Sequence, residues 1–535
     1  MKETRTESID IGTSSPDDED AFWLQETKPV TTAHHLTHLQ KVAVTAHLST
    51  VNFISCAANG LVVIGLPKMA EELNLPDNLA FWPSSVGGLT TASTLLLAGS
   101  VADVVGQRII NLLGCLINGI LMIGCGLIQQ GESLIALRAV QGVGLALHYS
   151  TSVALVTQAM QPGRERNVAF SCLGLSQPLG FSFGLVTGGL LVETMGWRSG
   201  WYLYGSSTLM ISILSYWIVP KDCYDLTLDS IIQKLKSNVD WVGAFLASAA
   251  MTLISYYLMY VIQLSTLPLN SAYEILRIIS SSIEKGKQVQ NIVALCLGII
   301  SLPLFIGWTH YRTICRKPPL IPNSIWLNAS FTSICGTIFL SFAVLNSLEL
   351  FSSLFFQEVQ LLSATEAAIR ILPSLLIGVV LNLTTGLFVH VAPIRLLTIC
   401  CSLFTAGAPL LMATNKPDRS YWYHSFPAQL LMPISCDITF TVGLIIITNT
   451  FPEDKQAVAG AVFNTATQSG NSFGLATMQV VSTLATKSSS HLAHASALWE
   501  GYKASFWVMT GLMILCAAIG GIGLKNVGKI GLRGN

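Results

Sequence analysis

The chain has 535 residues, of which 51% are hydrophobic and only 11% are charged, and its formal net charge is zero. Soluble proteins carry about 25% charged residues, so the composition excludes an ordinary soluble protein and predicts an all-α integral membrane protein. Without a basic excess, no nucleic-acid partner is expected. The sequence lacks the glycine patterns of nucleotide-binding loops and has no C-x-x-C among its 12 cysteines. We therefore expect no cofactor, no metal site and no disulfide framework.

The N-terminal segment is polar and acid-rich, with Asp17-Asp18-Glu19-Asp20 at its centre. Such a composition cannot bury a core, and it predicts a disordered tail over residues 1–43. The segment does not resemble a signal peptide, because the first apolar run begins only after Lys41.

Fourteen apolar runs follow, each near the roughly 20 residues that cross a bilayer as a helix. They cover approximately residues 44–66, 80–102, 109–128, 132–157, 166–190, 201–219, 241–263, 291–311, 329–355, 367–390, 394–413, 424–447, 455–482 and 503–524. An even number places both termini on one side of the membrane. With the termini inside, 14 basic residues fall in inner segments and nine in outer loops. Because basic residues favour the cytoplasmic side, we predict cytoplasmic termini.

A short loop joins the second and third runs, with the sequence Gly99-Ser100-Val101-Ala102-Asp103-Val104-Val105-Gly106-Gln107-Arg108. Gly99 and Gly106 allow a sharp turn and close backbone approach. Asp103 and Arg108 could pair at the membrane face and separate when helices tilt, which predicts a cytoplasmic latch. A plain turn with a solvated ion pair is the alternative. The spacing resembles the cytoplasmic-loop signature of the major facilitator superfamily, with matches at Gly99, Asp103, Gly106 and Arg108 and with Val101 replacing the usual leucine.

A weaker copy of this loop, from Gly386 to Arg395, lies between the tenth and eleventh runs. His390 takes the place of the aspartate, and Pro393 takes that of the second glycine. Parallel repeats are typical of transporters. We therefore predict two six-helix halves with an inserted central pair, divided as 1–43 (tail), 44–219 (first half), 220–328 (linker with helices seven and eight), 329–524 (second half) and 525–535 (C-terminal tail).

The fourth run places Arg138, Gln141 and Gly142 on one helix face. Arg138 lies about six residues from the outer end, or roughly 9 Å deep at 1.5 Å per residue. Such an arginine costs several kcal/mol unless it faces a cavity or a partner; snorkelling to the outer surface is the alternative. The pattern resembles the superfamily's fourth-helix motif. This resemblance implies that Arg138 takes part in proton coupling, with Gln141 beside it.

The fifth run carries Gly180, Gly184 and Gly188 at every fourth position, followed by Gly189. Together with Gly142 of the fourth run, they predict close packing against neighbouring backbones and a seam where helices rock. Packing without a hinge function is the alternative. The stripe resembles the antiporter motif of the superfamily, except that Leu185 replaces its proline.

Several further segments match in chain order. They are Trp82, Gly196-Trp197-Arg198, Asp240-Trp241-Val242-Gly243, Pro318-Pro319-Leu320-Ile321-Pro322 and Gln456-Ala457-x-x-Gly460-x-x-x-Asn464. With the preceding motifs, the set from about residue 44 to 524 resembles the fourteen-helix drug:proton antiporter family in its fungal branch. The resemblance implies the major facilitator fold and export of drugs or secondary metabolites.

Two acids lie within runs of the second half, Asp437 near mid-depth and Glu349 nearer the outer side. A carboxyl group in this position is neutral, paired or hydrated. Both are candidates for proton coupling. The alternatives are a protonated core acid for Asp437 and a vestibule surface acid for Glu349. The first run has Asn52 and Asn59 but lacks the aspartate of many relatives, so a proton site must lie elsewhere or the coupling is altered.

The leading hypothesis is export of a small organic compound by proton antiport, with protons and the lipid bilayer as the other partners. Proton-coupled import, including siderophore uptake, and a receptor that binds without transport are the alternatives. No enzyme motif is present, so an enzyme is not expected. We expect a monomer in the plasma membrane, with the vacuolar membrane as the alternative.

Overall fold

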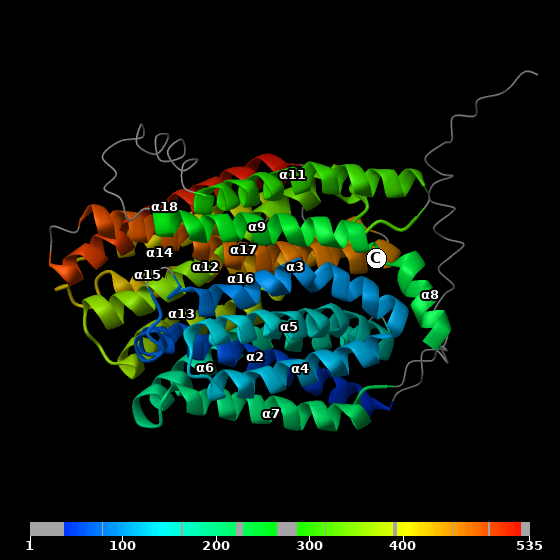
Figure 1. Cartoon of the computed structure of the whole chain (residues 1–535), viewed down its shortest axis with the longest axis horizontal. Coiled ribbons are helices and arrows are strands. Elements are labelled where there is room, and N and C mark those ends of the chain that lie inside the picture. Colours follow the sequence, from blue (N-terminus) through cyan, green and yellow to red (C-terminus); the bar gives the residue numbers. More distant parts are fainter. Residues whose placement is uncertain are drawn as a thin grey trace, which may run out of the picture.

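The computed structural model describes residues 37–76, 79–161, 164–220, 228–264, 286–315, 317–388, 393–451, 453–489 and 493–525. The predictions for most of the N-terminal tail, for His390 and for the last ten residues lie outside these ranges. The described chain consists mainly of long helices that run side by side along the longest axis of the molecule (Figure 1).

The first half contains six helices, which are α2 (His38–Glu72), α3 (Trp82–Val105), α4 (Gln107–Leu127), α5 (Gly131–Ala159), α6 (Arg164–Thr194) and α7 (Trp197–Ile218). The middle segment contains α8 (Leu228–Asn238), α9 (Trp241–Leu264), α11 (Gly286–Ile314) and the short 3-10 helix η2 (Asn323–Leu327). The second half contains α12 (Ala329–Leu354), the π-helical turn η3 (Phe355–Val359), α13 (Ala364–Phe388), α14 (Ile394–Ala413), α15 (Ser425–Leu431), α16 (Ile434–Thr450), α17 (Glu453–Ser488) and α18 (His494–Gly523).

Each predicted apolar run coincides with a described helix, and the twelfth run coincides with α15 and α16 together. Among the described residues, 11 helices are long and apolar enough to cross a membrane, or 12 if α8 and α9 form one bent span. Helices α7 and α17 are not among them. The chain is therefore a multi-pass membrane protein, and the number fourteen stays a prediction.

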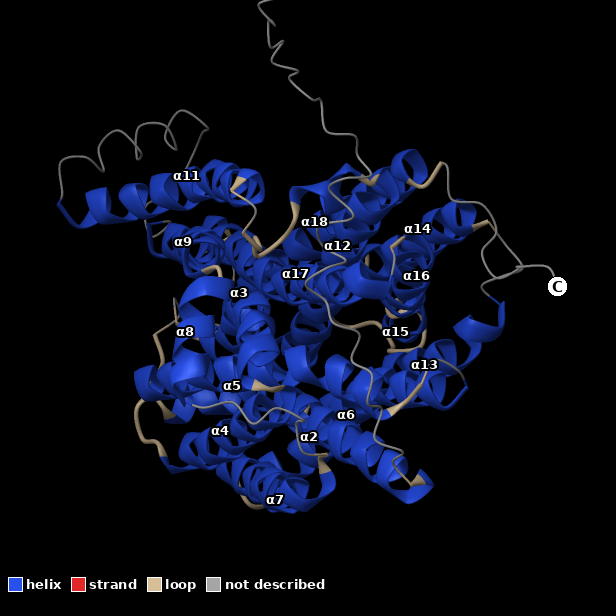
Figure 2. Ribbon diagram, turned by 90° about the vertical axis from the view of Figure 1, so that its right-hand side faces the viewer, coloured by secondary structure: helices blue, strands red, loops and turns tan. Residues whose placement is uncertain are grey.

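The two halves repeat one packing scheme. In the first half, α2 packs on α6, α4 on α7 and α3 on α5; in the second half, α12 packs on α17, α14 on α18 and α13 on α16. In each half, therefore, the first helix contacts the fifth, the third the sixth, and the second the fourth. The halves meet where α6 lies against α13 and α3 against α17, and Figure 2 shows this arrangement along the bundle.

The inserted helices α9 and α11 pack on each other at the edge of the bundle (Figure 2). Helix α9 contacts both α3 and α17, so it lies across the boundary between the halves. Ser248 of α9 donates a hydrogen bond to the carbonyl oxygen of Ser93 on α3, at 2.6 Å. The inserted pair thus covers one side of the junction without entering its centre.

The predicted orientation can be tested by labelling two exposed positions. Lys416 lies in the loop after α14, and Asp229 lies at the start of α8. If the termini are cytoplasmic, a membrane-impermeant thiol reagent should label Lys416→Cys on intact cells and should label Asp229→Cys only after permeabilisation. The unsubstituted chain, which has its own exposed cysteines, gives the background. The opposite labelling pattern would reverse the orientation.

Candidate functional site

A cavity of about 180 Å³ lies between the two halves. One water needs only about 10–15 Å³ by the same measure, so the cavity has room for a small organic molecule. Helices α2, α3, α5 and α6 line one wall, and α12, α13, α16 and α17 line the other. Aromatic side chains (Phe181, Phe342 and Phe440) alternate there with amides, as in most sites for organic ligands.

Arg138 lines this cavity from α5 and is only 2% exposed. Its Nε donates to the carbonyl oxygen of Pro83 at 3.1 Å, its Nη1 to Gln141 Oε1 at 2.8 Å, and its Nη2 to Asn59 Oδ1 at 2.9 Å. Its guanidinium carbon lies 5.5 Å from the centre of the Trp201 ring. The arginine therefore does not snorkel to the surface, and its N–H groups donate hydrogen bonds to neutral oxygen atoms.

The amide contacts continue from Arg138 into the first half. Gln141 Nε2 donates to Asn118 Oδ1 at 3.0 Å, and Asn118 Nδ2 donates to Ser55 Oγ at 3.0 Å. Gln141 and Asn118 are at most 1% exposed. The sequence predicted that Arg138 and Gln141 share a helix face. The partners from α2 and α4 could not be identified, because an amide within an apolar run does not show which residue of another helix lies at the same depth.

Asp437 and Glu349 line the opposite wall of the cavity, from α16 and α12. Glu349 is 5% exposed, whereas Asp437 is only partly buried. A Cβ atom at Gly378 of α13 would lie 2.8 Å from Asp437 Oδ2, so the glycine leaves room for this carboxyl group. Asn382, one turn further along α13, lies within hydrogen-bonding reach of Asp437.

The basic group and the acidic groups of the cavity belong to different halves of the chain. Arg138 belongs to the first half and makes no ion pair among those of the described residues. The two carboxyl groups belong to the second half and line the same wall of the cavity. Like charges in one low-dielectric site disfavour each other, and a proton or a cationic group would relieve that repulsion. The cavity therefore brings two carboxyl groups, one arginine and several aromatic side chains to the same space.

The glycine stripe of α6 lies against α2. An added Cβ at Gly180 would overlap the backbone of Phe53, and one at Gly184 would overlap the backbone of Ala57. A Cβ added at Gly188 would lie 3.0 Å from the Cα of Leu61 on α2, and one added at Gly189 would lie 3.1 Å from the carbonyl oxygen of Ala364 on α13. The backbones therefore touch, as small residues at every fourth position permit in membranes. Gly142 makes a similar approach to Gly87 and Thr90 of α3.

The second half contains an equivalent glycine pair that we did not predict. Gly470 and Gly474 of α17 face the backbones of Phe339 and Ala343 of α12, with no room for a side chain. Asn471 beside them accepts a hydrogen bond from Asn346 Nδ2 of α12 at 2.6 Å. The G-x-x-x-G spacing was the available signal.

The loop at residues 99–108 does not contain the suggested ion pair. Asp103 accepts a hydrogen bond from Gln107 Nε2 at 2.8 Å. Arg108 instead donates to the carbonyl oxygen of Tyr216 at the end of α7, at 2.5 Å, and lies over the Tyr216 ring. Gly106 has φ 116°, a conformation that favours glycine, and it allows α4 to begin directly after α3. The turn is as predicted, whereas the latch stays a prediction.

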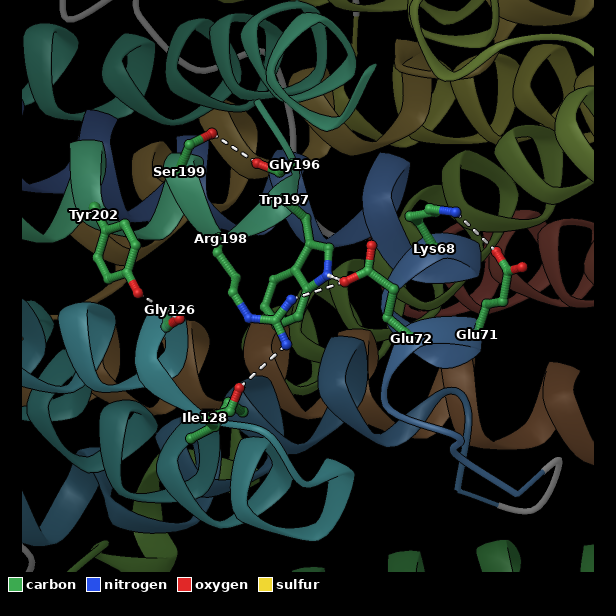
Figure 3. Close-up of polar contacts among 10 residues, drawn as sticks. All are labelled: Lys68, Glu71, Glu72, Gly126, Ile128, Gly196, Trp197, Arg198, Ser199 and Tyr202. Carbon is green, nitrogen blue, oxygen red and sulfur yellow. Dashed lines mark hydrogen bonds and ion pairs between the residues drawn. The ribbon is translucent and has the colours of Figure 1, made fainter. Parts of the chain in front are cut away.

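The Gly196-Trp197-Arg198 segment joins three helix ends, as Figure 3 shows. Trp197 Nε1 and Arg198 Nη1 both donate to Glu72 Oε2, at 2.9 and 2.8 Å, and Arg198 Nη2 donates to the carbonyl oxygen of Ile128 at 3.3 Å. Glu72 ends α2, and Ile128 follows α4. This motif therefore holds together the ends of α2, α4 and α7.

Two segments that resemble the antiporter family, one beginning at Asp240 and the other at Pro318, are in contact in the structure. Asp240, 2% exposed, accepts hydrogen bonds from Gly243 N at 2.9 Å, Trp308 Nε1 at 2.8 Å and Leu320 N at 3.1 Å. Arg312 lies 3.8 Å from Asp240 and donates to the carbonyl oxygen of Pro318. One buried carboxyl group thus connects α9, α11 and the proline-rich segment before α12.

Hydrogen bonds also connect the halves at the helix ends near Ile64, Glu193 and Thr365. Glu193 of α6 accepts one from the backbone N–H of Thr365 at the start of α13, at 2.8 Å. Gln357 and Ser353 donate to the carbonyl oxygens of Ile64 and Val63 on α2, at 3.2 and 3.3 Å. At the opposite end the ion pair lies within the first half: Lys41 Nζ of α2 lies 2.8 Å from Glu165 Oε2 at the start of α6, and the lysine lowers the pKa of the Glu165 carboxyl group.

The sequence matches the family described as "Major Facilitator Superfamily" over residues 48–475. The "MFS-type transporter 1" of Pyricularia oryzae is 32% identical, with 93% of this chain and 85% of that protein covered. The "Efflux pump terJ" of Aspergillus terreus is 22% identical, with 86% and 83% covered. The "Low affinity ammonium transporter" of Saccharomyces cerevisiae is 23% identical, with 87% of each covered.

Solved structures share the fold at low sequence identity. A bacterial homologue of the human lysosomal transporter Spinster, in an inward-facing and unoccupied conformation, has a TM-score of 0.61 and 13% identity, covering 92% of this chain and 98% of that one. The human organic anion transporter MFSD10 (TETRAN) has a TM-score of 0.52 and 13% identity, covering 88% and 99%.

Proposed function

Because the chain belongs to the major facilitator superfamily, as a transporter-type membrane protein and not an enzyme, we propose that it exports a small organic compound by proton antiport. We further propose membership of the fourteen-helix drug:proton antiporter family, with two six-helix halves and the inserted pair α9 and α11. The compound would be a drug, a toxin or a secondary metabolite. Relatives named as efflux or resistance proteins support export.

The observation that carries this proposal is the separation of charge across the central cavity. Arg138 on one wall is held by neutral amides, while Glu349 and Asp437 occupy the other wall. If the halves rock about the cavity, these acids face each side of the membrane in turn, which is what coupled transport requires. We assign proton coupling to Asp437 and Glu349, with Arg138 and Gln141 as the charge and the amide that modulate them.

The glycine seams support the rocking motion. Gly180, Gly184 and Gly188 in the first half, and Gly470 and Gly474 in the second, remove side chains from the contact between the first and fifth helix of each half. Smooth backbone surfaces can slide by small amounts without repacking large side chains. We propose that Gly142 and Gly189 serve the same purpose against α3 and α13.

A flux assay in sealed vesicles tests the proposal directly. Liposomes that contain the purified protein, with an imposed pH gradient, should accumulate at least one compound from a panel that includes puromycin and aminotriazole, which the names of relatives suggest. Antiport requires that the compound accumulates in the vesicles while protons move out of them. Movement of compound and protons in the same direction would instead establish import, and binding without flux would establish a receptor.

We propose a monomer in the plasma membrane, with both termini in the cytosol. Crosslinking in membranes should then leave the chain at monomer size, and a fluorescent fusion should mark the cell surface. Staining of the vacuolar membrane would correct the location without affecting the transport mechanism.

We also propose that the loop with Gly99, Asp103, Gly106 and Arg108 acts as a cytoplasmic latch. Asp103→Asn keeps an acceptor for Gln107 but removes the negative charge. Charge-assisted contacts contribute about 1.5–3 kcal/mol, so flux should fall by roughly ten- to a hundredfold while the amount of protein in the membrane is unchanged. Gln107→Leu keeps the charge of Asp103 but removes its hydrogen-bond donor, so flux in this variant distinguishes an effect of the charge from an effect of this hydrogen bond. Normal flux in Asp103→Asn would show that the loop is only a turn.

A further inference from the structure

A second group of ionisable side chains lies inside the first half, away from the cavity lining. His47 of α2 is 3% exposed and His148 of α5 is fully buried. Asn111 of α4, also fully buried, lies between the two rings. Neither histidine contributes to the cavity wall or to the antiport mechanism described above.

The hydrogen bonds around Asn111 define a proton arrangement. Asn111 Nδ2 donates to His148 Nδ1 at 3.2 Å and to Thr151 Oγ1 at 2.8 Å, and its Oδ1 faces His47 Nε2 at 3.3 Å. His148 Nε2 faces Asn52 Oδ1 at 3.2 Å. All these contacts are favourable only when both rings carry a proton on Nε2 and His148 Nδ1 is bare, because an amide nitrogen only donates and an amide oxygen only accepts.

We propose that His47, Asn111 and His148 form a second proton-binding site, in which the Asn111 amide is a two-position switch. A proton on His148 Nδ1 would point at the Asn111 NH₂ group. Rotation of the amide by half a turn presents Oδ1 to this proton and turns Nδ2 toward His47 Nε2. His47 must then accept there, so it releases its Nε2 proton and takes one on Nδ1. One proton enters the site overall.

His47 Nδ1 has an open position for that proton, and the Nδ1–H would need an acceptor that the described residues do not supply in the present conformation, such as a water molecule. The Nδ1 atom is buried and has no hydrogen-bond partner among the described residues. A buried nitrogen without a hydrogen-bond partner is unfavourable. The cost is smaller when Nδ1 carries no proton, because no N–H donor is then left without an acceptor. The contacts of the present arrangement are thus those expected for the proton-free position of the switch.

The groups facing His148 do not compensate an added positive charge in this conformation. Helix α2 presents His47, and α4 presents Cys115, whose Sγ lies 3.4 Å from His148 Nδ1. Tyr149 follows on α5 itself, with its ring centre 5.9 Å away. Helices α3 and α6 carry their nearest acids at their cytoplasmic ends, where Asp103 binds Gln107 and Glu165 binds Lys41; on α17, the ionisable side chain that the structure describes is Lys487, near the opposite end.

Protonation should therefore favour a different packing of α2, α4 and α5, in which water or a counter-charge reaches the site. Proton binding would then drive a change of conformation in the half that lacks a membrane acid in its first helix. This function in transport rests on the proposed antiport, whereas proton binding itself does not.

Nitrogen NMR of the histidine rings tests the site without any transported substrate. The full chain, labelled with ¹⁵N-histidine and placed in lipid vesicles, is measured from about pH 8 to about pH 5, the range in which histidines titrate. His47→Gln and His148→Gln assign the two signals. We expect His148 to become a cation while His47 changes from the Nε2–H to the Nδ1–H form with the same midpoint.

Two variants provide controls for the coupling. In Asn111→Leu both rings remain but the switch is removed, so His47 should keep its tautomer when His148 titrates. His310→Gln, on exposed α11, should remove one signal and leave the pair unchanged. The proposal is overturned if His148 stays neutral to pH 5 in folded protein, or if His47 does not respond. A positive NMR result without proton-driven flux would refute antiport and retain the site.

Discussion

Asp437→Asn is expected to abolish flux driven by a pH gradient while substrate binding is retained. Asparagine has nearly the shape of aspartate, so it fits beside Gly378 and within reach of Asn382. It cannot release and rebind a proton, however. Without that step, a coupled carrier cannot use the gradient, and accumulation should fall to the level of vesicles without protein.

Glu349→Gln is the matched comparison, because it removes the other carboxyl group of the same wall. Glu349 is more buried, and it makes no hydrogen bond or ion pair among the contacts of the described residues. Its loss should shift the pH dependence of flux and leave part of the transport. If Asp437→Asn retained full gradient-driven flux and Glu349→Gln lost it, the coupling assignment would move to Glu349. If both retained it, neither carboxyl group would be needed for proton coupling, and the assignment to Asp437 and Glu349 would be wrong.

The second large effect is expected for Gly184→Leu. The backbone of Ala57 occupies the position where even a Cβ would lie, so leucine forces α6 away from α2 along their whole contact. Overpacking a well-fitted core typically costs about 1–3 kcal/mol, and here the obstacle is backbone that cannot rotate aside. We expect a lower unfolding temperature in detergent and no measurable flux.

Two further glycines make this experiment specific. Gly474→Leu should have the same effect, because Gly474 meets the backbone of Ala343 in the second half. Gly511→Leu on α18 is the control, because no atom lies within 4 Å of a Cβ built there. If Gly184→Leu behaved like Gly511→Leu, the contact between α2 and α6 would not limit stability or transport.

Much of the fold could be predicted from the sequence, because a bilayer imposes its own rule on the chain. Backbone groups in hydrocarbon must be satisfied internally, so each long apolar run becomes a helix. The predicted runs and the described helices therefore coincide, even where α17 is too polar to be counted as a span. The sequence also placed Arg138 and Gln141 on one face, because helical periodicity is local.

Only the tertiary structure decided which helices meet and what their polar groups bind. Asp103 and Arg108 are close in sequence, yet each binds a different partner, because Arg108 reaches the end of α7. Arg138 lies opposite the two acids rather than beside them, and its partners Asn59 and Gln141 are neutral. A carboxyl group or an amide in an apolar run shows that a partner is needed, but the partner is set by helix packing between distant segments.

The same reason explains the histidine pair. His47, Asn111 and His148 are far apart in the chain, and each alone is an unremarkable polar residue within an apolar run. Their contact depends on the depth and rotation of three helices at once, and only the packing of those helices fixes both. The sequence by itself determined that this protein is built from membrane helices, and it left open whether Arg138 faces a cavity or snorkels to the surface. The packing of those helices placed Arg138 in the cavity wall and determined where the ionisable groups meet.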